Sequence, residues 1–264
     1  MMLYLTPALT AYILTLAAVL GLVMGSFLNC LAWRLAHGES IARGRSHCAV
    51  CGHTLAARDL VPLFSWLFLR GRCRYCGEKI SPRYPAAELV TALVYVSVLL
   101  RCDVSWQALR FLLLFSVLIA TSLVDLEVGL IPDRLLAAGA AGFLLLALPE
   151  GAAALPLLAR GALGAASLFV PMLLLVLLFD KLTGRDTMGG GDLKLLALLG
   201  LYFGWQLGLL ILILSCLLGL LLALILGKAK PNTPFPFGPA LAAAAWLTFL
   251  VGEPILNWYL GLFV

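Results

Sequence analysis

"LGLLILILSCLLGLLLALILG", residues 207–227, is an apolar stretch that contains no charged side chain. A helix needs about 20 such residues to cross the hydrocarbon core of a bilayer, so this stretch predicts a transmembrane helix. The rest of the chain has the same character, because 63% of its 264 residues are hydrophobic and 12% are charged. An ordinary soluble domain is about half apolar. The composition therefore excludes that class and indicates a membrane protein.

Similar apolar runs recur along the chain, separated by short polar connections. They predict an all-α polytopic membrane protein with about eight transmembrane helices. The first run lacks a basic leading region and is longer than the core of a signal peptide, so we expect a retained helix there. The predicted spans are residues 8–33, 86–101, 107–124, 133–148, 157–179, 192–205, 207–227 and 238–258.

The basic residues predict the orientation in the membrane, because Lys and Arg in short loops are retained on the cytoplasmic side. Nine of the 18 lie in residues 34–85, which we therefore place in the cytoplasm, with both chain ends outside. Loops that this topology makes cytoplasmic carry further cations: Lys181, Arg185, Lys228 and Lys230. The net charge of +5 suits a surface that faces anionic lipid and requires no nucleic-acid partner.

Residues 34–85 are the only sizeable polar segment, and they divide the chain into three parts. Residues 1–33 are expected to form the first transmembrane helix, residues 34–85 a small cytoplasmic domain, and residues 86–264 a transmembrane core.

The cytoplasmic segment contains "CAVC" and "CRYC", which supply Cys48, Cys51, Cys73 and Cys76. Two C-x2-C pairs about twenty residues apart can place four thiolates tetrahedrally around one ion, and a glycine follows each pair. A segment of this size has little apolar core, so a structural zinc would supply folding free energy. The pattern therefore predicts a four-cysteine zinc site.

Other interpretations of these residues are weaker. Disulfides would not persist in the reducing cytoplasm, whereas an iron centre of the rubredoxin type, or a histidine in place of one cysteine, stays open. The nearby histidines are expected to be solvated loop residues: His37, His47 and His53. The remaining cysteines lie in or beside apolar spans and are expected to pack there: Cys30, Cys102 and Cys216.

Acidic residues are costly in a membrane, so each suggests a function. Asp125 stands in "TSLVDLEVGLIPD", where the third predicted span reaches the cytoplasmic face, and Asp192 begins the sixth span. The two aspartates come from different helices at the same depth, so we expect them to meet.

Each acid also has a structural interpretation. Asp192 follows a glycine loop and would suit a helix N-cap, and Asp133, after Pro132, is expected to begin the fourth helix. Asp125 has no such explanation, because the dipole at a helix C-terminus disfavours negative charge. The residues favour a two-carboxylate catalytic site, with a proton-coupled transporter or a purely structural module as the alternatives.

Six separated motifs resemble one family, the prepilin leader peptidases of type IV pilus and type II secretion systems. They are "GSFLNCLAWR", the paired "CAVC" and "CRYC", "ISPRYPAAELVTAL", "DLEVGLIPD", "GGGDLKLL" and "PFGPAL", in the family's order between residues 25 and 241. The resemblance implies intramembrane aspartyl proteolysis of the Gly-x-Gly-Asp type, with Asp125 and Asp192 as catalytic acids.

The same resemblance assigns further residues to the active-site loop: Gly189, Gly191, Lys194, Pro236, Phe237, Gly238 and Pro239. We expect the glycines before Asp192 to permit the backbone angles and close approach that a peptide substrate requires, and to leave the loop mobile enough to admit it. Lys194 lies about 200° around the helix from Asp192, so we expect it to reach headgroups or an acidic substrate group instead.

The resemblance also implies a substrate. It would be a prepilin or pseudopilin with a short basic leader, cleaved at the cytoplasmic face of a bacterial inner membrane. Members commonly methylate the new N-terminus with S-adenosylmethionine, and the resemblance attaches five residues to that step: Gly25, Ser26, Asn29, Arg34 and Glu88. Their structural interpretation is polar packing between helices.

Overall fold

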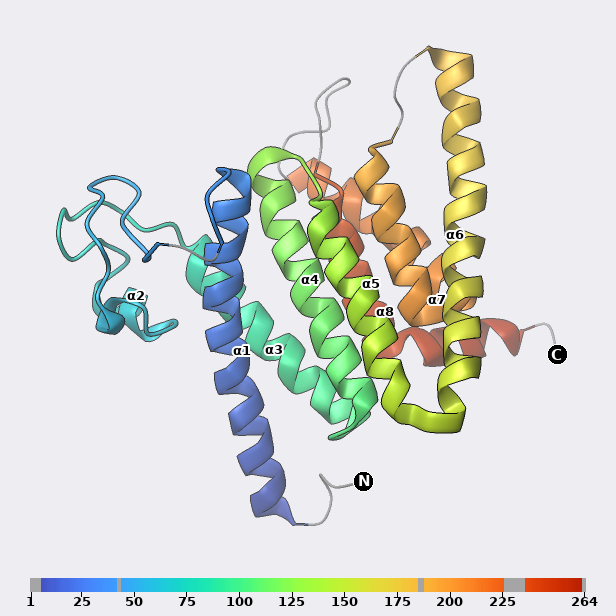
Figure 1. Cartoon of the computed structure of the whole chain (residues 1–264), viewed down its shortest axis with the longest axis horizontal. Coiled ribbons are helices and arrows are strands. Elements are labelled where there is room, and N and C mark those ends of the chain that lie inside the picture. Colours follow the sequence, from blue (N-terminus) through green and yellow to red (C-terminus); the bar gives the residue numbers. More distant parts are fainter. Residues whose placement is uncertain (1–5, 42–43, 185–187, 226–235, 263–264) are drawn as a thin grey trace. The chain divides into compact units, whose positions relative to one another are not determined.

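The computed structural model describes residues 6–41, 44–184, 188–225 and 236–262. Within these residues the regular structure is helical, apart from two isolated β-bridges. The contacts divide the chain into two compact units, Met1–Ala108 and Leu109–Val264 (Figure 1). The predicted all-α polytopic fold is confirmed, and the predicted three-part division of the chain remains a prediction.

The first unit is a pair of long helices, α1 (Pro7–Ala36) and α3 (Arg83–Cys102), with a polar insert between them in sequence. Thr6 caps α1 by accepting a hydrogen bond from the backbone of Leu9. The helices approach closely at glycines of α1. A Cβ added to Gly21 would lie 2.5 Å from Cα of Ala92 in α3. The insert contains a 3-10 turn, η1 (Ala57–Asp59), and a short helix, α2 (Phe64–Phe68).

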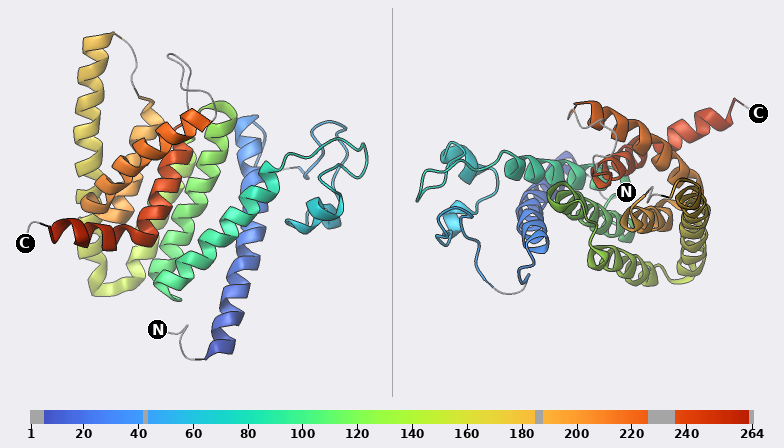
Figure 2. Two further views of the ribbon diagram at one scale, coloured as in Figure 1. Left: turned by 180° about the vertical axis from the view of Figure 1, so that it is seen from behind. Right: turned by 90° about the horizontal axis from the view of Figure 1, so that it is seen from above.

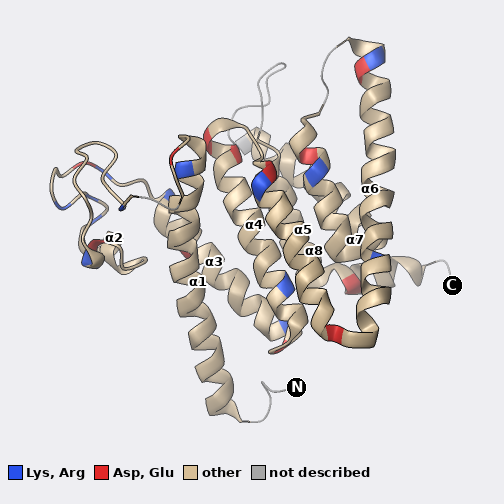
Figure 3. Cartoon of the chain, in the orientation of Figure 1, with Lys and Arg blue, Asp and Glu red and all other residues tan. Residues whose placement is uncertain are grey.

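The second unit is a bundle of longer apolar helices. Its elements are α4 (Trp106–Val128), which begins just before the boundary, α5 (Asp133–Ala147), the 3-10 segment η2 (Leu148–Ala153), α6 (Ala154–Thr183), α7 (Gly190–Ile225) and α8 (Gly238–Leu260). As Asp133 does begin α5, that prediction is confirmed. Figure 3 shows that most charged residues lie near helix ends or in the insert, so the middle parts of the helices carry few charges.

The helix α7 turns back on itself at Gly204 (Figure 2). Gly204 has φ 74° and ψ 179°, backbone angles that are essentially confined to glycine. Contacts along α7 follow the reversal. Asp192 lies near Asp125 at one end of α4, the Phe203 ring is 5.4 Å from that of Phe111 near the other end, and Gly219 lies beside Phe237 at the first end again. One apolar helix thus supplies two antiparallel arms.

These arms correspond to the predicted spans 192–205 and 207–227, although residues 226 and 227 lie outside the described residues, as do Arg185, Lys228 and Lys230. Six continuous helical stretches are long and apolar enough to cross a membrane. Two of them, Asp133–Thr183 and Gly190–Leu224, are each interrupted by a kink, at Gly151 and Gly204. The described residues thus contain six such stretches, and the predicted number of eight spans stays a prediction.

Candidate active site and metal centre

Asp125 lies near the C-terminal end of α4 and is buried, with 6% of its surface exposed. Its Oδ2 accepts a hydrogen bond of 2.8 Å from the backbone N–H of Gly238, the first residue of α8. The next residue, Pro239, has no N–H, so Gly238 provides the free amide at this helix start. Within the predicted segment Pro236, Phe237, Gly238 and Pro239, it is Gly238 that holds Asp125, and the positioning role of the segment as a whole stays a prediction.

Asp192 lies in the first turn of α7, but it does not cap that helix. The helix begins at Gly190, and the backbone N–H of Asp192 donates to the carbonyl of Gly189 at 3.1 Å. The side-chain Oδ1 of Asp192 is buried and accepts no hydrogen bond from any described residue. A buried polar atom without a partner is rare in proteins and costs free energy. The N-cap interpretation is therefore wrong.

The structure brings Asp125 and Asp192 close enough for their charges to interact. They come from opposite ends of two helices, the last turns of α4 and the first turn of α7, and both are largely withdrawn from solvent. A pair of close carboxylates in which one is held by an amide and the other has an unused oxygen can bind a water molecule and share a proton.

Of the three glycines before Asp192, Gly191 is the one in a crowded position. None of Gly189, Gly190 and Gly191 has a positive φ, and the expectation that they permit the backbone angles that a peptide substrate requires stays a prediction. A Cβ on Gly191 would lie 2.7 Å from Cβ of Ile131, which precedes α5. A Cβ on Gly189 would meet only Asp192 Oδ2, at 3.2 Å. Gly191 therefore lies close against Ile131, in the connection between α4 and α5.

Lys194 points to Asp133. Its Nζ lies 2.8 Å and 2.9 Å from the two carboxylate oxygens of Asp133. The expectation that Lys194 avoids the face of Asp192 agrees with this pairing, whereas the proposed contacts with headgroups or substrate are replaced by an ion pair within the chain. Asp133 therefore forms an ion pair with Lys194 and is not part of the pair formed by Asp125 and Asp192.

The four cysteines of the insert form a second site, in the first unit. The Sγ atoms of Cys48, Cys51, Cys73 and Cys76 all lie within 4.8 Å of one another, and those of Cys48 and Cys76 are 3.9 Å apart. In a tetrahedral site with Zn–S bonds of about 2.3 Å, the sulfurs are about 3.8 Å apart. All four thiols are free rather than joined in disulfides. The donor set therefore fits one zinc ion.

Two turns with the same hydrogen bonds present these cysteines. In the first, Cys48 N–H donates to His53 O and Gly52 N–H to Cys48 O; in the second, Cys73 N–H donates to Glu78 O and Gly77 N–H to Cys73 O. Gly52 and Gly77 both have positive φ, 68° and 74°. The prediction that glycine allows each tight turn is confirmed.

The thiols of the cluster differ in pKa. Hydrogen bonding from the backbone of Cys51 contributes most to lowering the pKa of Cys48 to about 7, which favours its thiolate. The backbone of Glu78 lowers the pKa of Cys76, but burial and hydrogen bonds with the other three thiols outweigh this and raise it to about 12. Beside the second turn, the Arg74 guanidinium donates to Asp59 at 2.7 Å and lowers the pKa of that carboxyl.

The histidines lie outside the thiol cluster. His37 stacks on Trp33, His47 meets the edge of the same ring, and His53 lies against Tyr75. All three are exposed, as expected. Among the other cysteines, Cys30 and Cys102 are partly buried, whereas Cys216 is exposed on α7, a helix apolar enough to face lipid.

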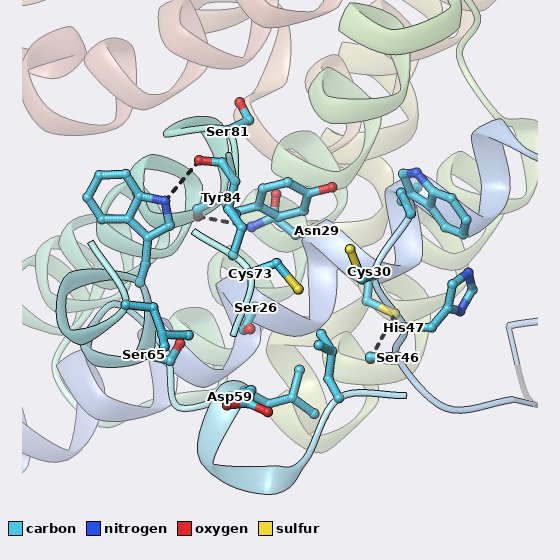
Figure 4. Close-up of a pocket in the computed structure, with 18 of the residues that line it drawn as sticks. Ser26, Asn29, Cys30, Ser46, His47, Asp59, Ser65, Cys73, Ser81 and Tyr84 are labelled. Atoms are coloured by element: carbon cyan, nitrogen blue, oxygen red, sulfur yellow. Dashed lines mark hydrogen bonds between the residues drawn. The ribbon is translucent and has the colours of Figure 1, made fainter. Parts of the chain in front are cut away.

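A cavity of about 420 Å³ lies between the insert and the facing surfaces of α1 and α3. Four of the five residues attached to methylation line it: Ser26, Asn29, Arg34 and Glu88. Ser26 and Asn29 are labelled in Figure 4. Gly25 instead packs the helices, because an added Cβ would lie 2.6 Å from Cα of Glu88.

Several polar groups of this cavity bond to the chain itself. Asn29 donates to the carbonyls of Gly25 and Tyr84, Arg34 to those of Ser40, Ile41 and Gly44, and Glu88 Oε2 accepts from the Leu63 N–H at 2.6 Å. The interpretation of Asn29, Arg34 and Glu88 as polar packing residues therefore holds for the side-chain atoms that make these hydrogen bonds.

The sequence analysis missed the aromatic rings of this cavity, which are Trp33, Trp66 and Tyr84. They are scattered over α1, α2 and α3, and no spacing in the sequence indicates that they face one space.

The chain resembles known proteins over most of its length. The profile of the Bacterial Peptidase A24 N-terminal domain matches residues 19–102, and that of the Type IV leader peptidase family matches residues 112–224. These two ranges fall one in each compact unit.

Three relatives are each named prepilin leader peptidase/N-methyltransferase. The protein of Aeromonas hydrophila is 41% identical over 223 residues, covering 83% of this chain and 76% of the relative. That of Pseudomonas putida is 37% identical and covers 93% of both chains. That of Bacillus subtilis is 34% identical, covering 94% of this chain and 98% of the relative. No solved structure matches the chain.

Proposed function

The chain belongs to the type IV leader peptidase family, and we propose on that basis that it removes the leader peptide of type IV prepilins or type II secretion pseudopilins. Asp125 and Asp192 are the catalytic acids of this proposal. The observation that carries it is the buried Oδ1 of Asp192, which has no partner among the described residues and lies beside the buried Asp125.

The chemistry requires the two carboxylates to hold one proton between them. The ionised carboxyl accepts a proton from a bound water as the water oxygen attacks the scissile carbonyl carbon, and the protonated carboxyl donates to the carbonyl oxygen. A proton then passes to the leaving amide nitrogen as the C–N bond breaks. The Gly238 N–H fixes Oδ2 of Asp125, which leaves its other oxygen for this exchange.

The reaction is expected at the cytoplasmic face of the bacterial inner membrane. The concentration of Lys and Arg in residues 34–85 supports that orientation. A leader with basic residues would stay on the same side for the same reason, with the hydrophobic segment that follows it in the bilayer.

The test is cleavage of a purified prepilin in detergent, measured as a shorter product by mass spectrometry. Asp125→Asn and Asp192→Asn are each expected to abolish cleavage, because one amide cannot share or transfer the proton. Asp133→Asn is the matched control, since this acid is already paired with Lys194. Cleavage by either of the first two variants, at a rate near that of the wild type, would refute the dyad.

We also propose that the cavity beside the thiol cluster is the site of N-methylation. Its volume lies in the range typical of small-ligand sites. Trp33, Trp66 and Tyr84 provide rings on which an adenine or a sulfonium group can rest, and Glu88 provides a carboxylate. Bound there, S-adenosylmethionine would supply a methyl group to the new N-terminal amine.

Under this proposal the zinc is structural. Cys48 and Cys73 contribute to the wall of the cavity, so an ion held by the four thiolates would fix that wall. Binding of S-adenosylmethionine to the intact protein, measured by calorimetry, is expected to weaken at least tenfold in Trp66→Ala, about 1.4 kcal/mol. Unchanged binding in this variant, with zinc content retained, would place the methyl donor elsewhere.

A further inference from the structure

The insert between α1 and α3 carries an apolar face that stays exposed in the part of the chain that the structure describes. Phe64, Leu67 and Phe68 have exposed fractions of 52%, 54% and 83%. Their spacing of i, i+3 and i+4 places them on one side of α2. The preceding Leu60 and Val61 are exposed as well, at 41% and 45%. Residues 60, 61, 64, 67 and 68 are called the α2 face below.

The opposite side of α2 is attached to the rest of the unit. Trp66 and Ser65 line the cavity, and the Trp66 indole N–H donates to the carbonyl of Ile80 at 3.1 Å. The backbone N–H of Leu63 donates to Glu88 Oε2 of α3. These bonds fix α2 beside the two long helices, so the α2 face has a defined direction.

The attachment also fixes the depth of α2 along these helices. Glu88 lies five residues after the start of α3, and Ser26, on the same cavity, lies ten residues before the end of α1. Figure 1 shows α2 beside the C-terminal half of α1 rather than beyond its end.

The length of α1 allows the depth of α2 to be compared with the thickness of a bilayer. Its 30 residues span about 45 Å, whereas the hydrocarbon core is about 30 Å thick. The surplus of about 15 Å is the length of ten residues. Residues 7–33 contain no charged side chain, and Arg34 is the first charged residue of α1, so the surplus lies toward the C-terminal end. The level of Ser26, and with it α2, then lies at or just inside the boundary between acyl chains and headgroups.

We propose that the α2 face is a membrane-docking surface that inserts into this boundary. Phe and Leu side chains suit the acyl region, and aromatic side chains are enriched at the interface. Arg58, Arg70 and Arg72 are exposed on the same insert and suit anionic headgroups. Docking would hold the wall of the cavity against the lipid, at the level where a substrate helix leaves the bilayer.

The test is photocrosslinking of the full-length protein in nanodiscs of phosphatidylcholine and phosphatidylglycerol. A benzophenone amino acid replaces Phe68 in one variant and Leu67 in another. The matched control is the same replacement of Val50, an apolar residue of the first cysteine turn that is 68% exposed. Retained zinc content shows that each variant has a folded insert.

The proposal predicts a product heavier by one lipid, formed several-fold more often at positions 67 and 68 than at position 50. Equal yields at the three positions would overturn it. Crosslinks at 67 and 68 that go chiefly to an added prepilin, or to a second copy of the chain, would also overturn it, because they would assign the face to a protein partner.

Discussion

Lys194 Nζ contacts both carboxylate oxygens of Asp133, at 2.8 Å and 2.9 Å, and so joins the first turn of α7 to the first turn of α5. Asp192 lies two residues before this lysine. The ion pair therefore joins the start of the helix that carries Asp192 to the start of α5, and we propose that Asp133 acts in positioning rather than in proton transfer.

The first prediction concerns this ion pair. Both side chains are exposed, and exposed pairs contribute about 0–1 kcal/mol, so Asp133→Asn and Lys194→Met should each lower the cleavage rate by less than about tenfold. Because the residues act together, the double variant should be no worse than either single one. Rates measured on one prepilin, with thermal unfolding as a control, check this. Complete loss in Asp133→Asn, with an active Lys194→Met, would make Asp133 a reacting acid.

The second prediction separates the three consecutive glycines. Gly191→Ala would place a Cβ 2.7 Å from Cβ of Ile131, and overpacking of this kind costs about 1–3 kcal/mol. Gly190→Ala meets nothing within 4 Å and lies at the start of a helix, where alanine is favourable. We expect cleavage to fall in the first variant and to stay near wild type in the second.

A second substitution tests the cause. Ile131→Ala removes the atoms that the new Cβ would meet, so Gly191→Ala/Ile131→Ala should recover part of the lost cleavage. If Gly190→Ala were as damaging as Gly191→Ala, the glycines would be needed for backbone freedom rather than for space.

The third prediction concerns the amide that holds Asp125. In Gly238→Ala the new Cβ would lie 2.9 Å from Asp125 Oδ2, so the carboxylate must shift. A displacement of about 1 Å at a reacting group can cost about 100-fold in rate, and we expect a loss of that size in kcat. Gly252→Ala is the control, because it crowds Thr248 at 2.6 Å further along the same helix. It should lower the melting temperature but leave kcat of the folded enzyme unchanged.

The apolar runs predicted the helices well, because length and hydropathy are local properties of the sequence. The predicted boundary between two spans at residues 205–207 was also correct. The chain is helical on both sides of Gly204 and changes direction there through the backbone angles of that one residue. The ends of the spans were less accurate. The predicted span 157–179 lies within a helix of 30 residues, Ala154–Thr183, which continues through Pro156 at one end and through Asp180 and Lys181 at the other.

The partners of the site residues could not be predicted from sequence. Lys194 and Asp133 are 61 residues apart, and Gly238 and Asp125 are 113 apart, so neither contact leaves a local signal. The four cysteines were predictable, because a C-x2-C turn is formed by neighbouring residues and the ligand atoms are the side chains themselves. The cavity was not, because its aromatic rings come from three separate elements.

The last prediction is that zinc binding and cleavage can be separated. The thiols lie in the first compact unit, whereas Asp125 and Asp192 lie in the second, and proteolysis by two carboxylates needs no metal. Structural zinc contributes about 10–16 kcal/mol to the folding of small zinc domains, so Cys73→Ser/Cys76→Ser should lose zinc and unfold the insert. Methylation should then disappear, while some cleavage remains in detergent.

Cys102→Ser/Cys216→Ser is the control for this variant, because both residues lie outside the thiol cluster and should leave zinc content unchanged. Mass spectrometry of the mature substrate reads both steps, through loss of the leader and the added methyl group. If methylation survives the loss of zinc, the function of the cavity does not depend on the thiol cluster. Loss of cleavage with an intact second unit would instead mean that the insert presents the substrate to the aspartates, since nothing else in the proposed chemistry depends on the metal.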